Sequence, residues 1–294
     1  MSCYYFAYGS NLDLDDLRRF EIEHFDSESF SDSLEVLDGI FFLPDYELEF
    51  PVFSASRNCG VLNVRKNLGH VVAGKLFKVD SLDVLNRKEG CSSSGTGFYD
   101  RVSVSVIDEC GKIHDAITYV VSSEKNCYVE PSDDYVQFVL NGYQKYEISS
   151  KYPFAKNNLL NASKKRQTTP INSVFIYGTL LEGESREHHM SQFSVQKIKT
   201  KISAKMFDIG SYPAIILEPG IVHGELHQIE PVEELDTLDH IEGFDGYVSE
   251  SLYYRVLINT ENGLTWTYVW NGSVTNLNEI SNGDWKNRNN EKLN

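Results

Sequence analysis

The stretch YYFAYGSNL at residues 4–12 recurs as SVFIYGTLL at residues 173–181. In each copy an aromatic or β-branched run stops at a Tyr-Gly pair, which is the pattern of a short buried strand that ends in a turn. The first copy continues as DLDDLRRF, where three aspartates within residues 13–16 favour the positive end of a helix, and Ser10 or Asn11 is a candidate N-cap. The stretch therefore predicts a strand, a tight loop and a helix, present twice.

Further landmarks follow both copies in the same order. The first half contains GHVVAGKLFKVD, LDVLNRKEG, GFYDRVSVSV and DAITYVV, and the second half contains GIVHGELHQIE, LDTLDHIEG, SLYYRVLINT and TWTYVW. Each half thus repeats a strand that contains glycine, a short helix closed by Glu-Gly, and two further strands. A repeat of this length indicates two domains of ordinary size rather than a solenoid.

A polar stretch separates the two halves. Residues 148–173 are rich in Asn, Ser and Lys and are interrupted by Pro153 and Pro170, which is typical of a linker. The sequence predicts one domain over residues 1–165 and a second over residues 166–294.

Composition argues against several classes of protein. The chain has 294 residues, 41% of them hydrophobic, and a formal net charge of −16, so it is expected to fold and to repel a nucleic-acid backbone. Its five cysteines, all in the first half, fit neither a disulfide scaffold nor a zinc site. No signal peptide or bilayer-spanning run is evident. We expect a cytoplasmic protein without nucleic-acid or membrane partners, without a metal or cofactor, and of undetermined oligomeric state.

Two features of each half could carry chemistry. A loop between a strand and a helix N-terminus can present backbone N–H groups to a carboxylate or carbonyl oxygen, although Gly followed by Ser and Asn is also ordinary turn sequence. Glu89 and Glu242 each end a predicted helix beside a glycine, where the helix dipole, and burial if present, would raise the carboxyl pKa. The alternative is a solvent-exposed glutamate. Recurrence at matching places favours an acid/base role.

These motifs resemble those of the γ-glutamylcyclotransferase family. Residues 4–150, with FAYGSNL, DYELEF, LNRKEG and PSDDYVQFVLNGYQKY, are similar to the long form, and residues 173–286, with FIYGTLL, GIVHGELHQI, LDHIEGF and ISNGDW, are similar to shorter AIG2-like relatives that act on γ-glutamylamines. The resemblance implies an α+β fold with two tandem domains, each a small mixed β-barrel with flanking helices. It also implies a γ-glutamyl substrate whose own α-amine attacks its γ-carbonyl, releasing 5-oxoproline and a free amine or amino acid.

The resemblance also implies residues for both sites, with Glu89 and Glu242 as the acid/base groups. The implied substrate-binding residues are Tyr8, Gly9, Ser10, Asn11, Leu12, Tyr99, Tyr119 and Tyr135 in the first domain, and Tyr177, Gly178, Thr179, Leu180, Tyr254 (or its neighbour Tyr253) and Tyr268 in the second. The sequence shows no persuasive Ser-His-Asp or Cys-His arrangement, which suits a reaction whose nucleophile belongs to the substrate.

Three stretches stand outside this pattern. Residues 91–98, CSSSGTGF, lengthen the link from Glu-Gly to the next tyrosine, and Arg57 with its two following residues replaces aromatic and glycine-rich residues of the family. Both lie on the expected leaving-group side. His188 and His189 are expected on different sides of a solvated helix, without a metal.

Three functions are compatible with these residues. In the first, the domain over 1–165 acts on γ-glutamyl amino acids or dipeptides and the other domain acts on a different γ-glutamyl amide. In the second, the enzyme strips a γ-glutamyl protecting group from a metabolite. In the third, one domain binds γ-glutamyl compounds without turning them over.

Overall fold

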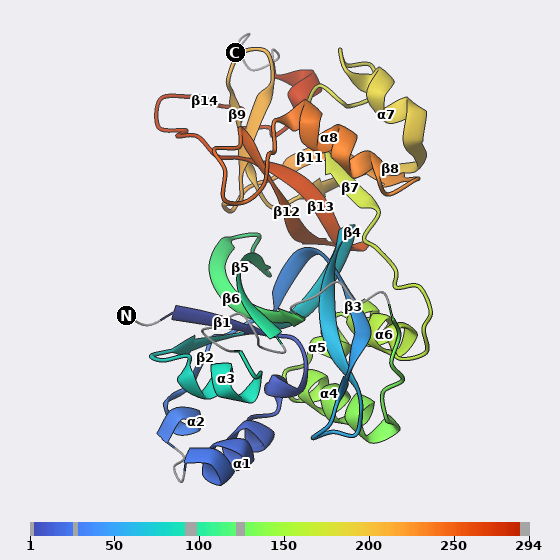
Figure 1. Cartoon of the computed structure of the whole chain (residues 1–294). Coiled ribbons are helices and arrows are strands. Elements are labelled where there is room, and N and C mark those ends of the chain that lie inside the picture. The colour runs from blue at the N-terminus through green and yellow to red at the C-terminus, as the bar shows by residue number, and fades with distance from the viewer. Residues whose placement is uncertain (1–2, 26–28, 92–98, 122–126, 289–294) are drawn as a thin grey trace. The chain divides into compact units, whose positions relative to one another are not determined.

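A computed structural model describes residues 3–25, 29–91, 99–121 and 127–288 (Figure 1). The chain divides into two compact units: unit 1 comprises residues 1–108 and 114–170, and unit 2 comprises residues 109–113 and 171–294. No helix within the described ranges is long and apolar enough to span a bilayer.

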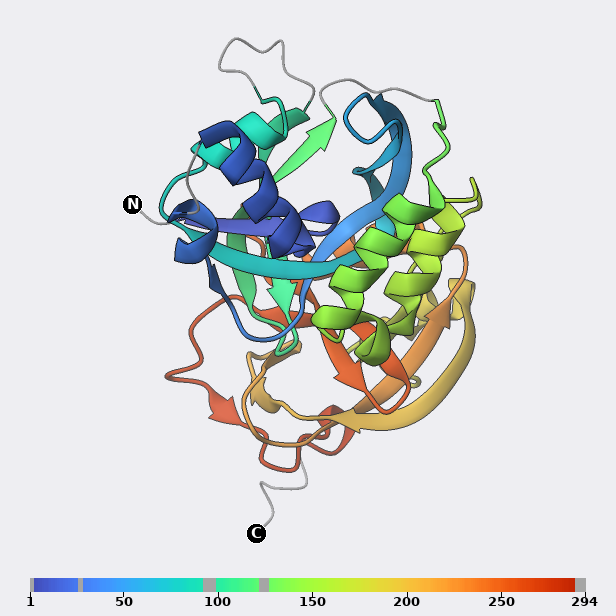
Figure 2. The ribbon, with the colours of Figure 1, turned by 90° about the horizontal axis from the view of Figure 1, so that it is seen from below.

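Five strands of unit 1 close into a small barrel: β1 (Cys3–Ala7), β3 (Phe41–Ser54), β4 (Cys59–Val79), β5 (Tyr99–Asp108) and β6 (Ile113–Val121). Their order is β1-β6-β5-β3-β4, and antiparallel pairing of β1 with β4 joins the two ends. The sheet is mixed because β1 runs parallel to β6. The short β2 (Glu35–Val36) adds to β4. Figure 2 shows the curvature of the long strands β3, in blue, and β4, in cyan. The α+β class predicted from the sequence is confirmed.

The helices of unit 1 are η1 (Ser10–Leu12), α1 (Leu14–Phe25), α2 (Ser29–Ser33), α3 (Asp83–Lys88), α4 (Asp133–Lys145), α5 (Ile148–Lys151) and α6 (Pro153–Ala162).

The helix predicted after the first Tyr-Gly loop is present but begins later than expected. The Asp13 carboxylate accepts hydrogen bonds from the N–H groups of Asp15, at 2.9 Å, and Asp16, at 3.3 Å. Asp13 therefore caps α1, and the candidate caps Ser10 and Asn11 lie instead in the preceding 3-10 turn.

The predicted linker over residues 148–173 is wrong in its first part, where α5 and α6 form and α6 packs on β3 and β4. Ala155, Leu159 and Ala162 recur at helical spacing and are buried. Pro153 begins α6, at a position where the missing N–H has no helical partner to lose. The abundant Asn, Ser and Lys residues conceal this apolar stripe.

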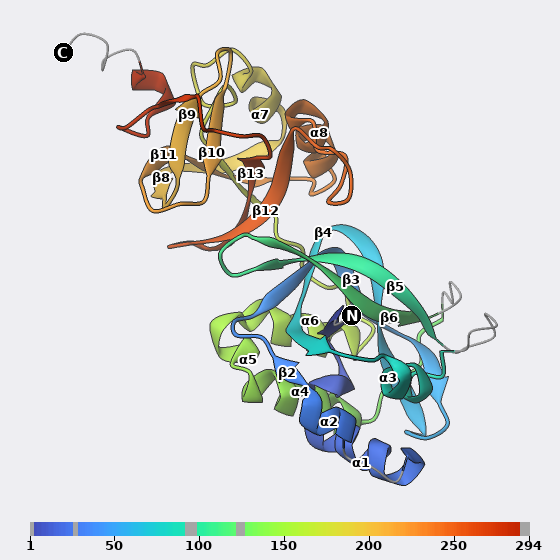
Figure 3. The same ribbon diagram turned by 90° about the vertical axis from the view of Figure 1, so that its left-hand side faces the viewer.

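Unit 2 contains strands β7 (Ser173–Ile176), β8 (Ser194–Ile202), β9 (Lys205–Asp208), β10 (Pro213–Ile216), β11 (Val222–Ile229), β12 (Tyr253–Thr260), β13 (Gly263–Trp270) and β14 (Asn278–Glu279). They form a five-stranded sheet in the order β12-β13-β7-β11-β8 and a three-stranded sheet in the order β10-β9-β14 (Figure 3). Strand β7 is antiparallel to β11 and parallel to β13, as β1 is to β4 and β6. The helices are α7 (Glu187–Phe193), α8 (Glu234–Glu242) and η2 (Trp285–Asn287).

In both units a glycine allows one strand to pass very close to the end of the strand before the Tyr-Gly loop. A Cβ atom on Gly74 of β4 would lie 2.3 Å from the carbonyl oxygen of Ala7, and a Cβ atom on Gly224 of β11 would lie 2.2 Å from that of Ile176. Only glycine allows these strands to pass the ends of β1 and β7 so closely. The sequence repeat is thus also a repeat of packing at the point where each Tyr-Gly loop begins.

Candidate active sites

The Tyr-Gly loop of unit 1 follows β1 directly. The Tyr8 hydroxyl donates a hydrogen bond of 2.8 Å to the carbonyl oxygen of Tyr119, so the loop is tied to β6, the parallel neighbour of β1. A cavity of about 40 Å³ lies at this loop. It is lined by Tyr5, Tyr8, Gly9, Ser10, Asn11, Leu62, Glu89, Tyr99, Tyr119 and Tyr135.

Glu89 reaches this cavity from the C-terminal end of α3. The chain turns away at Gly90, which has a φ of 62°, a left-handed conformation that suits a helix-ending glycine. The Asn11 side-chain amide donates to Glu89 Oε1 at 2.7 Å and to the Tyr5 hydroxyl oxygen at 2.6 Å. The loop and the helix end therefore meet at one carboxyl group.

Burial raises the pKa of Glu89 above its ordinary value, because the ionised carboxylate loses its hydration. The neighbouring Lys88 ammonium and the Asn11 amide favour the ionised form and limit the rise. Burial also raises the pKa values of Tyr99 and Tyr119, so their hydroxyls remain protonated and able to donate hydrogen bonds. The site thus combines one titratable carboxyl group with fixed phenolic donors.

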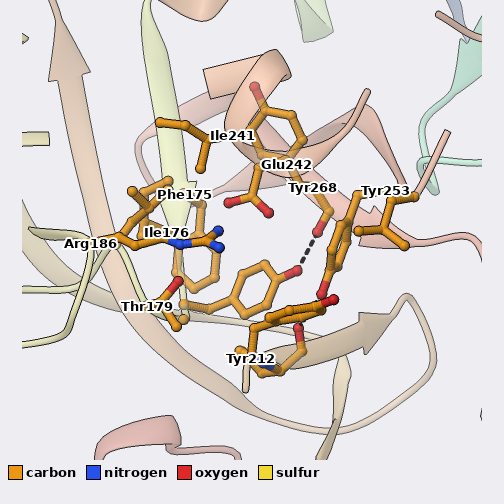
Figure 4. A pocket seen from close by; sticks show the side chains of 14 residues that line it. Phe175, Ile176, Thr179, Arg186, Tyr212, Ile241, Glu242, Tyr253 and Tyr268 are labelled. Carbon is orange, nitrogen blue, oxygen red and sulfur yellow. Dashed lines mark hydrogen bonds between the residues drawn. The ribbon is translucent and has the colours of Figure 1, made fainter. Parts of the chain in front are cut away.

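Unit 2 builds a similar constellation around Glu242, the last residue of α8, which is followed by Gly243 at a φ of 64°. The Tyr177 hydroxyl donates 2.7 Å to the carbonyl oxygen of Tyr268, as Tyr8 does to Tyr119. The cavity here measures about 100 Å³. It is lined by Phe175, Ile176, Tyr177, Gly178, Thr179, Leu180, Arg186, Tyr212, Pro213, Ile241, Glu242, Leu252, Tyr253 and Tyr268 (Figure 4).

The electrostatics of Glu242 differ from those of Glu89. Burial raises the pKa of Glu242 to about 7, and the Arg186 guanidinium holds it lower than burial alone would. Figure 4 shows both side chains pointing into the same cavity. No side chain in the described part of the chain donates a hydrogen bond to Glu242, whereas Asn11 donates one to Glu89.

The helix that carries each glutamate is anchored by an equivalent tyrosine. The Tyr119 hydroxyl donates 2.7 Å to Asn86 Oδ1, and the Tyr268 hydroxyl donates 2.8 Å to Asp239 Oδ1. Asn86 and Asp239 each precede the site glutamate by one helical turn, so they lie on the same face as it does. Each bond therefore helps to fix the rotation of the helix that presents the carboxyl group.

The structure places most of the residues proposed from the sequence around the two cavities, with two corrections. Leu12 does not line the cavity of unit 1; it is buried in contact with Gly142 of α4. Tyr254 does not line the cavity of unit 2, because neighbouring residues of a strand point to opposite sides. Tyr253 faces the cavity and donates 2.6 Å to the Pro213 carbonyl oxygen, whereas the Tyr254 hydroxyl donates 3.3 Å to the Ser249 carbonyl oxygen.

Several lining residues were not found from the sequence, chiefly Tyr5, Leu62, Arg186 and Tyr212. Tyr5 lies on β1, the strand that leads into the Tyr-Gly loop, and its position in YYFAY was an available signal. Arg186 has no counterpart in the repeat, so the comparison of the two halves could not reveal it.

Two of the unusual stretches are placed by the structure. Arg57 lies beside Glu89, in a groove that adjoins the cavity. Residues 92–98 of the lengthened stretch lie outside the described residues. The rings of His188 and His189 lie 4.0 Å apart, so the expectation that they point to different sides is wrong. Across the described ranges, no cluster of three or more His, Cys, Asp or Glu side chains is arranged to hold a metal ion.

Comparison with known proteins gives consistent matches. The family model for gamma-glutamyl cyclotransferase, AIG2-like, matches residues 174–287. The γ-glutamylcyclotransferase family protein YtfP of Escherichia coli K12 is 31% identical over 117 residues, which cover 39% of this chain and 96% of YtfP. The γ-L-glutamyl-butirosin B γ-glutamyl cyclotransferase of Niallia circulans is 32% identical over 120 residues, covering 39% of this chain and 75% of that protein.

Solved structures are also similar. A γ-glutamyl cyclotransferase covers 57% of this chain and 90% of its own, with a TM-score of 0.44 and 22% identity. YkqA of Bacillus subtilis covers 92% of this chain and 84% of its own, with a TM-score of 0.32 and 15% identity.

The coverage and identity of the sequence matches show that the chain belongs to the γ-glutamylcyclotransferase family. Membership of this family, which acts on small γ-glutamyl substrates, supports a cyclotransferase activity.

Proposed function

We propose that this chain converts γ-glutamyl amides to 5-oxoproline and a free amine at two sites, with Glu89 and Glu242 as the acid/base groups. The observation that carries the proposal is the recurrence, in both units, of a buried carboxyl group with a raised pKa facing a Tyr-Gly loop. A buried carboxyl group of this kind is suited to exchanging protons near neutral pH.

The reaction needs only proton transfers from the protein. The glutamate takes a proton from the α-ammonium group of the substrate, and the freed nitrogen attacks the γ-carbonyl carbon to form the five-membered ring. The carbonyl π electrons move to oxygen and return as the bond from the γ-carbon to the leaving nitrogen breaks. The leaving nitrogen takes this proton from the glutamic acid, and the regenerated carboxylate then removes the second proton of the ring nitrogen and passes it to the released amine, which departs as an ammonium ion. The site holds the glutamyl group of the substrate with its α-amine close to its γ-carbonyl, and this positioning supplies most of the rate enhancement of the intramolecular attack.

The residues of each cavity have distinct roles in this proposal. Backbone N–H groups of the Tyr-Gly loops stabilise the carboxylate of the glutamyl group and the developing oxyanion. The tyrosine hydroxyls hold the loops and the helix ends by donating within the protein, and their oxygens accept hydrogen bonds from the α-ammonium group of the substrate. The residues concerned are Tyr8, Gly9, Ser10, Asn11, Tyr99, Tyr119 and Tyr135 in unit 1, and Tyr177, Gly178, Thr179, Leu180, Tyr253 and Tyr268 in unit 2.

A pair of substrates tests the intramolecular attack. The full-length protein is incubated with γ-glutamyl-alanine and with the same dipeptide acetylated on its α-amine, and products are followed by mass spectrometry. We expect 5-oxoproline from the first substrate and no product from the second, because an amide nitrogen is a poor nucleophile. Release of free glutamate, or cleavage of the acetylated substrate, would show hydrolysis and contradict the proposal.

A second candidate is the removal of a γ-glutamyl protecting group from a larger metabolite. The relative from Niallia circulans, whose name states that it acts on γ-L-glutamyl-butirosin B, favours it. The chemistry at Glu242 would be unchanged, so substrate preference decides between the two. A kcat/KM for γ-glutamylated polyamines or aminoglycosides far above that for γ-glutamyl amino acids would support this candidate.

The two domains, predicted over residues 1–165 and 166–294, need not both turn over substrate. In our proposal the first acts on γ-glutamyl amino acids or dipeptides and the second acts on another γ-glutamyl amide. A Glu89→Gln chain that turns over no member of a γ-glutamyl panel but binds two equivalents of 5-oxoproline, one in each unit, would identify unit 2 as a binding module.

A further inference from the structure

A groove of about 640 Å³ adjoins the small cavity of unit 1, with which it shares Ser10, Glu89, Tyr99 and Tyr135. Basic side chains predominate among the charged residues of this groove, although the chain as a whole has a net charge of −16. The basic residues are Arg19, Arg57, Arg87 and Lys88, and the acidic residues besides Glu89 are Asp16 and Glu23.

Three basic side chains of this groove share one carboxylate. Asp16 Oδ2 lies 2.5 Å from Arg57 Nη2 and 2.7 Å from Lys88 Nζ, and Asp16 Oδ1 lies 3.7 Å from Arg19 Nη2. When Glu89 is ionised, two carboxylates face the three positive charges of this cluster, which leaves an excess of one positive charge. This excess lies at the mouth of the site and would attract an anionic group.

Arg57 is the member of this cluster best placed to bind a ligand. The side chain of Lys88 is only 9% exposed, and that of Arg19 is 66% exposed but lies 3.7 Å from Asp16, whereas that of Arg57 is 33% exposed and is held at 2.5 Å. The Arg57 guanidinium lies 5.3 Å from the centre of the Phe138 ring, and its bond to Asp16 uses only part of its donor capacity. The Arg57 guanidinium is fixed in position and partly accessible, and its planar arrangement of N–H donors matches the two oxygens of a carboxylate.

We propose that this groove binds a carboxylate on the leaving amine of the unit 1 substrate, with Arg57 as a specificity-determining residue. This inference rests on the proposed function. The γ-carbonyl of the substrate must lie within reach of Glu89, and Glu89 borders both the small cavity and the groove. With the glutamyl group in the small cavity, the leaving amine on the other side of the γ-carbonyl extends into the adjoining groove. Asp16 and Lys88 position Arg57 there.

Two substrates that differ in one charge test this inference. The 294-residue chain carries Glu242→Gln, so that only unit 1 contributes, and kcat/KM is measured for γ-glutamyl-alanine and for γ-glutamyl-alaninamide. We expect a preference for the free carboxylate on the order of 10-fold, the usual size of a charge-assisted hydrogen bond. Arg57→Gln should reduce this ratio toward 1, and Arg57→Lys should retain part of it.

Arg65→Gln is the matched control, because Arg65 is an exposed arginine of unit 1 that pairs with Glu47 and Glu49 and does not line the groove. It should leave the substrate ratio unchanged. Circular dichroism verifies that each variant folds. A wild-type ratio near 1, or a ratio that survives Arg57→Gln, overturns the inference while 5-oxoproline formation still supports the proposed function. Absence of 5-oxoproline from both substrates overturns the inference together with the proposed function of unit 1.

Discussion

At the scale of single residues, the two sites each contain a buried glutamate, and different partners adjust the pKa of its carboxyl group. Glu89 accepts a hydrogen bond from Asn11, while Glu242 faces the guanidinium of Arg186. In both cases burial is the main cause of the raised pKa, and the partner opposes it. Substitution of each partner is therefore expected to change the pH dependence of its site.

Removal of Arg186 should shift the activity of unit 2 to higher pH. Its positive charge favours the carboxylate of Glu242, so Arg186→Gln should raise the pKa of Glu242 above about 7. Because the proposed reaction begins with an ionised glutamate, the rising limb of kcat/KM against pH should move to higher pH. The profile is measured in a Glu89→Gln background, with the exposed Lys199→Gln as control. An unchanged limb would show that Arg186 does not act on Glu242.

The raised pKa of Glu242 also predicts a loss of stability as pH rises. In the unfolded chain this group titrates near 4.5, and in the folded chain near 7, so between these values only the unfolded state loses the proton. Stability of unit 2 should therefore fall by about 3 kcal/mol from pH 4.5 to pH 7 and stay lower above.

Glu242→Gln cannot ionise and should lose that part of the pH dependence, with a higher midpoint of unfolding than wild type at pH 8. All three tryptophans of the chain lie in unit 2, so tryptophan fluorescence follows its unfolding. Glu261→Gln, an exposed substitution in the same unit, should behave as wild type. A Glu242→Gln variant less stable than wild type at pH 8 would contradict the burial argument.

At the scale of elements, the packing of β11 against β7 sets the start of the second Tyr-Gly loop. Gly224→Ala would place a Cβ atom 2.2 Å from the carbonyl oxygen of Ile176, a backbone atom that cannot rotate away. The strands must separate, and we expect a loss of about 3 kcal/mol or more in urea unfolding followed by tryptophan fluorescence. His223→Ala, an exposed neighbour on β11, should cost little. An equally small effect of both substitutions would show that the close approach is not needed.

The sequence predicts these elements well where local pattern decides the structure. The Tyr-Gly loops and the glutamates at helix ends follow from apolar runs, glycines and their recurrence, so Glu89 and Glu242 could be found without a structure. Prediction fails where tertiary packing decides. The stripe on α6 is hidden in a polar segment, and the choice between Tyr253 and Tyr254 depends on which side of β12 faces the cavity. Arg57 could be noticed as unusual, but its place beside Glu89 depends on the folding of distant segments.

At the scale of the whole molecule, the chain carries two sites of similar construction but different electrostatics. Glu89 is hydrogen-bonded and lies beside a basic groove, whereas Glu242 lies beside Arg186. We therefore expect the two sites to prefer different leaving amines. A panel of γ-glutamyl amides given to the Glu89→Gln and Glu242→Gln variants should therefore yield two different preference orders. Identical orders would show that the differences in lining do not select substrates.

The central claim, that both buried glutamates are acid/base groups of a 5-oxoproline-forming reaction, is tested most directly by the double variant. Wild type, Glu89→Gln, Glu242→Gln and the double variant are given the same γ-glutamyl panel, and 5-oxoproline is quantified. We expect each single variant to lose part of the panel and the double variant to lose activity by a factor of about 100 or more. A correctly folded double variant as active as wild type would contradict the account.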